Sequence, residues 1–174
     1  MIHKATKLII NSFDEHSVKY CVTEVADASM VEAAFEVEAG HEVVVRYISN
    51  DEGNDVAVRI FGLIHRIPST KRVDVMEACN TLSAKIRFFK FYLDSNSSVN
   101  VEADLPVRTD DECIGECCVE LFVRIMRILD NEYHILAEAL YGDPTNRKRE
   151  PIEMLRILRE LHDKPLVVNG EPEG

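Results

Sequence analysis

Several features that would place the protein at a membrane or outside the cell are missing from its sequence. It has no run of about 18 apolar residues, the length that a membrane-spanning helix needs. Residues 1–15 lack the long apolar core and the small-residue cleavage site of an export signal, so we expect them to fold as an amphipathic helix. With five cysteines, an odd number, and no such signal, we predict reduced thiols and a cytoplasmic protein.

Positive charge is scarce. The chain has 20 lysines and arginines against 31 aspartates and glutamates, which gives a formal net charge of −11. This excess repels phosphate backbones and anionic lipids, so we predict neither a nucleic-acid partner nor a membrane partner. At 174 residues with 46% hydrophobic side chains, the chain is long enough to bury a core without disulfides or a metal.

Motifs for cofactors and catalysis are also missing. The glycines form neither a Walker loop nor a GxGxxG turn. Cys113, Cys117 and Cys118 are close in sequence, but no second pair with zinc-ligand spacing accompanies them, so we interpret them as core or half-exposed thiols. His41-Glu42 lacks the later histidine of a zinc protease helix. We therefore predict no metal, no cofactor and no enzymatic activity.

The periodicity of the apolar residues indicates the fold. Helical spacing covers residues 3–14, 70–86, 110–141 and 151–161, and alternation typical of strands covers residues 18–23, 31–38, 43–49, 55–63, 89–93 and 99–105. The order α-ββββ-α-ββ-α-α predicts an α+β domain with a largely antiparallel sheet packed against helices. We expect one domain over residues 1–142, followed by a linker, an amphipathic helix and a mobile tail over residues 143–174.

Three short segments resemble a known family. They are Asn80-Thr81-Leu82, the stretch RFFKFYLD at 87–94, and the stretch VNVEADLP at 99–106. Together they resemble the YbjN-like family, described as bacterial sensory transduction regulators, over about residues 5–141. That family is similar in fold to type III secretion chaperones, small acidic homodimers that bind an extended segment of a partner. The resemblance thus implies a homodimer that binds a protein or peptide more than an enzyme, and it supplies no catalytic residues to carry over.

One part of this region allows two interpretations. Aromatic residues alternate with Arg87 and Lys90, as on a surface that stacks nucleic-acid bases. Strand alternation instead directs Phe89 and Phe91 into the core and Lys90 outward, and we favour a core with a solvated rim.

Our leading hypothesis is a non-enzymatic, chaperone-like protein-binding module. We expect a homodimer that pairs through the long helix 110–141 or through the exposed face of the sheet. The alternative is a small-ligand-binding protein or enzyme with a pocket between sheet and helices, using His65, Asn80, Arg87 and Asp104. Asn80 lies near the apolar stripe of its helix, where we expect a buried amide that ties the helix to a neighbouring segment.

Overall fold

The structure is a computed structural model that describes residues 2–25, 27–37, 40, 42–49, 55–106 and 111–142. The predicted linker, helix 151–161 and tail lie outside the described residues. The elements within the described part are α1 (Lys4–Glu15), β1 (Tyr20–Val25), β2 (Ala28–Glu36), β3 (Glu42–Ser49), β4 (Val56–Ile64), a 3-10 turn η1 (Ser69–Lys71), α2 (Arg72–Lys85), β5 (Lys90–Leu93), β6 (Val99–Leu105) and α3 (Ile114–Tyr141).

All six strands form one antiparallel sheet in the order β1-β2-β3-β4-β6-β5. The first four strands follow one another as a meander, the arrangement that short connections favour. The β5–β6 hairpin then adds to the sheet through its second arm, because β6 pairs with β4 and leaves β5 at the edge.

The pairing of β4 with β6 is irregular near Gly62, between Ile60 and Ile64. Gly62 has a φ of +66°, and a Cβ there would overlap the ring of His65. The buried amide of Asn100 fixes this bend, since its Oδ1 accepts the Gly62 N–H at 2.7 Å. Its Nδ2 donates to the Asp94 carboxylate at 3.0 Å, which ties β4 to the turn between β5 and β6.

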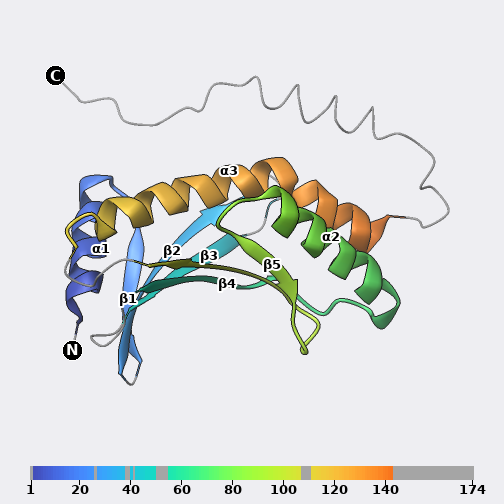
Figure 1. Ribbon diagram of the computed structural model, residues 1–174, viewed down its shortest axis with the longest axis horizontal. Coiled ribbons are helices and arrows are strands. Elements are labelled where there is room, and N and C mark those ends of the chain that lie inside the picture. Colours follow the sequence, from blue (N-terminus) through green and yellow to red (C-terminus); the bar gives the residue numbers. More distant parts are fainter. Residues whose placement is uncertain are drawn as a thin grey trace. The chain divides into compact units, whose positions relative to one another are not determined.

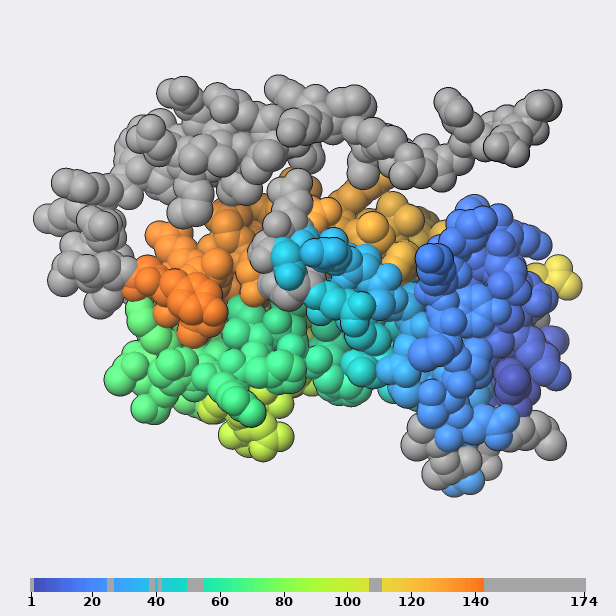
Figure 2. All heavy atoms as spheres, turned by 180° about the vertical axis from the view of Figure 1, so that it is seen from behind, coloured from blue at the N-terminus to red at the C-terminus, as the bar shows by residue number. Residues whose placement is uncertain are grey.

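Alternation along the strands places their buried apolar side chains on one face, and the helices cover that face (Figure 1). The Tyr47 hydroxyl on β3 donates to the Cys118 carbonyl of α3 at 3.0 Å. The Phe13 ring of α1 meets the Tyr47 ring edge-on, with 5.4 Å between centroids. Helices α1 and α2 both contact α3, near its opposite ends, as Figure 2 shows from behind.

These findings confirm the predicted α+β class with an antiparallel sheet. Most predicted bounds differ by only a few residues, but the long helix begins at Ile114, later than the predicted start near residue 110. At the start of the predicted helix 70–86, the 3-10 turn η1 directly precedes the α-helix α2. None of the helices among the described residues combines the length and apolarity required to cross a bilayer.

Candidate functional site

A groove of about 460 Å³ lies between the C-terminal end of α2 and the middle of α3. Lys85 ends α2, and Ile86 and Arg87 belong to the turn that follows. The facing wall comes from α3, because residues three and four positions apart share one face of a helix. Those α3 residues are Glu120, Val123, Arg124, Arg127, Ile128, Asn131 and Glu132.

Two of the four cationic side chains in this groove are already paired. Lys85 Nζ lies 2.7 Å from both carboxylate oxygens of Glu132, which joins the end of α2 to α3. Arg124 Nη2 lies 2.5 Å from Glu120 Oε1, one turn earlier on the same helix.

The other two cations are Arg87 and Arg127. Across the part of the chain that the structure describes, no carboxylate pairs with either guanidinium. Both side chains are exposed. They therefore remain available to an anionic group from outside the chain, and a guanidinium can hold a carboxylate through two parallel hydrogen bonds.

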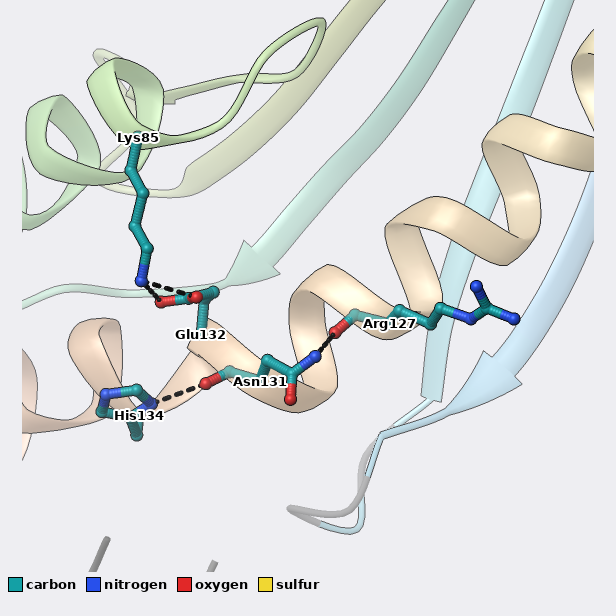
Figure 3. Close-up of polar contacts among 5 residues, drawn as sticks. All are labelled: Lys85, Arg127, Asn131, Glu132 and His134. Atoms are coloured by element: carbon teal, nitrogen blue, oxygen red, sulfur yellow. Dashed lines mark hydrogen bonds and ion pairs between the residues drawn. The ribbon is translucent and has the colours of Figure 1, made fainter. Parts of the chain in front are cut away.

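The α3 backbone around Arg127 is held by its own side chains, as Figure 3 shows. Asn131 Nδ2 donates to the Arg127 carbonyl at 2.7 Å, and His134 Nδ1 donates to the Asn131 carbonyl at 2.9 Å. The Arg127 guanidinium extends away from the other four labelled side chains. Arg127 is thus an exposed cation on the groove wall, while Asn131 and His134 form hydrogen bonds within α3.

An exposed aromatic ring, Phe88, lies beside the groove. Arg124 Cζ is 5.3 Å from its centroid, within the range of a cation–π contact. Phe88 has a φ of +76° and is 57% exposed. The left-handed region costs an L-residue about 1–2 kcal/mol. Phe88 therefore has a strained backbone and also leaves a large apolar side chain exposed to water. Such strain is concentrated at functional sites.

The groove is basic although the whole chain is acidic. At physiological ionic strength, charges are screened over about 8 Å, so the local side chains outweigh the distant acids. Four cations and two carboxylates line the groove. Val123 and Ile128 lie among them, and Val123 is 38% exposed. The groove therefore offers cationic and apolar contacts together.

The face of the sheet opposite the helices is a second candidate surface, with a different charge pattern. Its arginines are already neutralised, because Arg46 Nε lies 2.8 Å from Glu32 Oε1 and Arg59 Nη2 lies 2.7 Å from Asp104 Oδ1. Arg46 also lies over the ring of Phe61, 5.7 Å from its centroid. An anionic group from outside the chain would therefore meet paired arginines on this face, whereas the groove has unpaired ones.

The structure does not gather the four residues of the alternative hypothesis. His65 follows β4 at the Gly62 bend, 3.4 Å from Ser98 Oγ, while Asp104 lies on the open face of the sheet and Arg87 at the groove. Asn80 is exposed, so our expectation of a buried, bridging amide was wrong. The space between sheet and helices is filled by core side chains such as Phe13, Tyr47 and Leu82.

The five cysteines are free thiols that range from buried to exposed. Cys118 and Cys79 are buried, and burial raises the pKa of the Cys79 thiol to about 11. Cys113 and Cys117 lie with their Sγ atoms 4.0 Å apart, and a hydrogen bond with Asp111 raises the pKa of Cys113 to about 11. No group of three or more metal-ligating side chains occurs within the described residues.

Comparison with known proteins gives no assignment. No family model matches the chain, and no curated protein matches it either. The resemblance to the YbjN-like family therefore stays a prediction.

Most of the residues that line the groove were not predicted from the sequence. Arg87 was among the candidates, but Arg124 and Arg127 were not. The sequence signal that could have indicated the groove is the series Val123, Arg124 and Arg127, whose members are separated by one and three positions on the polar side of a long helix. This pattern also describes an ordinary solvated helix face, and only the packing of α2 against α3 distinguishes the two.

Proposed function

We propose that this protein is a non-enzymatic binding module that holds an acidic segment of a partner protein in the groove between α2 and α3. The observation that carries the proposal is the presence of two exposed, unpaired guanidinium groups among the described residues, on Arg87 and Arg127, beside the strained and exposed ring of Phe88. Each arginine supplies a fork of donors that matches a carboxylate. Together they favour a ligand with separated carboxylates.

Apolar groups in the groove and beside it favour a protein segment over a simple anion. Val123 and Phe88 are exposed by 38% and 57%, and both are available to an aliphatic or aromatic side chain. Large apolar and aromatic residues dominate the energetics of protein interfaces, whereas a bare phosphate would leave these contacts unused. The expected segment therefore combines glutamates or aspartates with at least one large apolar residue.

The test uses a fluorescently labelled peptide of alternating glutamate and leucine residues, titrated with the intact protein and followed by anisotropy. We expect saturable binding that weakens as salt is added. The double variant Arg87→Glu/Arg127→Glu should weaken binding tenfold or more, because it replaces two attractions with two repulsions. A peptide with lysine in place of glutamate should not bind.

The matched control is Lys7→Glu/Arg66→Glu. It changes the net charge by the same amount at two exposed positions that do not line the groove. Equal loss of binding in both double variants would mean that overall charge, and not the groove, attracts the peptide. Inorganic phosphate that competes as well as the peptide would show a small-anion site instead of a protein-binding one.

A further inference from the structure

Two thiols meet at the start of α3. Cys113 is the last residue before the helix, and Cys117 lies one turn further along. Their Sγ atoms are 4.0 Å apart, and the Cys113 carbonyl accepts the Cys117 N–H at 3.0 Å. Cys113 is exposed and Cys117 is half-buried, so a small reagent can reach the pair from solvent. A disulfide bond would bring the two sulfurs to about 2 Å.

The backbone before α3 allows this approach. Side chains one turn apart inside a helix have Cβ atoms about 5–6 Å apart, whereas a disulfide needs about 3.5–4.5 Å between its Cβ atoms. Cys113 lies in the turn that precedes Ile114, outside the helix, so it can move toward Cys117 without unwinding α3. The bond would still be strained, and strained disulfides are readily reduced.

We propose that Cys113 and Cys117 form a peroxide-sensitive dithiol, which closes to an intramolecular disulfide on oxidation and reopens when reductant returns. The pair differs from Cys79 and Cys118, because those two thiols are buried. Cys21 is also exposed, but it is the only cysteine of β1 and has no second thiol in its own strand. It therefore serves as an internal comparison for the pair.

The oxidation follows two balanced steps with hydrogen peroxide as the oxidant. A hydrogen bond with Asp111 raises the pKa of Cys113 to about 11, so this thiol keeps its proton at neutral pH. We therefore expect the Cys117 thiolate to attack peroxide first, which forms an S–O bond, breaks the O–O bond and releases hydroxide. The Cys113 sulfur then attacks the sulfenic acid, and its proton leaves with the departing hydroxide as water. Together, two thiols and one peroxide give one disulfide and two waters.

The charges beside the pair favour a neutral oxidant. Asp111 and Glu112 directly precede Cys113, and Glu116 lies between the two cysteines. All three carboxylates are exposed, and they repel an anionic reagent such as glutathione disulfide within the screening distance of about 8 Å. Hydrogen peroxide is uncharged and is not repelled. The second thiol is already in place, so it should react with the sulfenic acid before an external thiol does.

Oxidation at this position would affect the contact between α1 and α3. The segment between the two cysteines includes Gly115, which packs against the Leu8 carbonyl of α1. It also includes Glu116, whose carboxylate lies 3.1 Å from His16 Nε2 at the end of α1. A disulfide would shift the turn that leads into both contacts. We therefore expect the oxidised and reduced proteins to differ in their urea midpoints.

The test treats the intact, reduced protein with a slight excess of hydrogen peroxide. The remaining thiols are blocked with N-ethylmaleimide in denaturant, and the digested protein is mapped by mass spectrometry. We expect the peptide that contains Cys113 and Cys117 to lose two hydrogens and to escape the label at both positions. Reduced glutathione should reopen the bond in the native protein, while Cys21 should carry either the label or added oxygen.

The variant Cys113→Ser separates the two steps. Cys117 should still be oxidised, and its sulfenic acid should accumulate and be trapped by dimedone, because the second thiol is gone. The disulfide should be lost completely. The matched control is Cys21→Ser, which also removes one exposed thiol and should leave the disulfide unchanged. Both substituted positions are exposed, so the fold is retained, which circular dichroism checks.

Four results would overturn the proposal. A disulfide that survives in Cys113→Ser would join Cys117 to Cys118 instead. Recovery of Cys113 and Cys117 as free thiols or as separate sulfinic acids would mean that their sulfurs do not meet. A disulfide-linked dimer on a non-reducing gel, in place of the internal bond, would mean that the thiols react between molecules. A bond that glutathione cannot reopen in the native protein would be a permanent cross-link.

Discussion

Gly115, in the first turn of α3, lies where that helix meets α1. A Cβ built there would overlap Ser12 Oγ and would lie 2.5 Å from the Leu8 carbonyl oxygen. The second contact is with backbone in the middle of α1, so rotating a side chain cannot relieve it. We therefore expect Gly115→Ala to force α1 away from α3.

Two opposing effects set the size of this change. Alanine improves the helix propensity by at most about 1 kcal/mol over glycine. Overpacking of a close contact typically costs about 1–3 kcal/mol. Moving α1 also disturbs Ile9 and Phe13, which are completely buried. We expect the clash to outweigh the gain in helix propensity, so Gly115→Ala should lower the free energy of unfolding by about 1–2 kcal/mol.

Urea denaturation followed by circular dichroism measures this change. Ala84→Gly, at an exposed site in α2, calibrates the propensity effect in the same protein. Adding Ser12→Ala to Gly115→Ala should not restore stability, because the Leu8 carbonyl oxygen remains in place. A Gly115→Ala variant as stable as the parent protein would refute the close contact between these helices.

Three further predictions concern the core and the β5–β6 turn. Tyr47→Phe removes the hydrogen bond to the Cys118 carbonyl and should cost about 1 kcal/mol in urea denaturation; no loss would argue against that bond. Cys79 and Cys118 should resist a thiol reagent at mildly alkaline pH until denaturant is added, because burial raises the pKa of both thiols; mass spectrometry of the native protein would reveal early labelling. The hydrogen bond from the Ser98 N–H holds the pKa of Asp94 below its usual value. The ionised Asp94 carboxylate therefore contributes stability above about pH 4, and this contribution is lost as pH falls through the lowered pKa. Asp94→Asn should flatten the decline in the urea midpoint between about pH 5 and pH 2, and an unchanged decline would contradict this role.

The sheet could be predicted because its signal is local. Val43 and Val45 alternate with half-exposed residues on β3, and the same alternation marks each neighbouring strand. Phe89 and Phe91 are buried and Lys90 is exposed, as strand alternation required. Each of these results depends only on the period of two along a strand.

The side of α2 on which Asn80 lies was harder to predict, and the reason is physical. Val73 and Met76 are apolar yet 65% and 45% exposed, so apolar residues occur on both sides of this helix. The expected apolar stripe, which includes Val75 and Leu82, is nevertheless the buried one, but a position beside such a stripe can face either the core or the solvent. Asn80 was therefore assigned to the core side, and only the packing of α2 on β5 and α3 reveals that it is exposed.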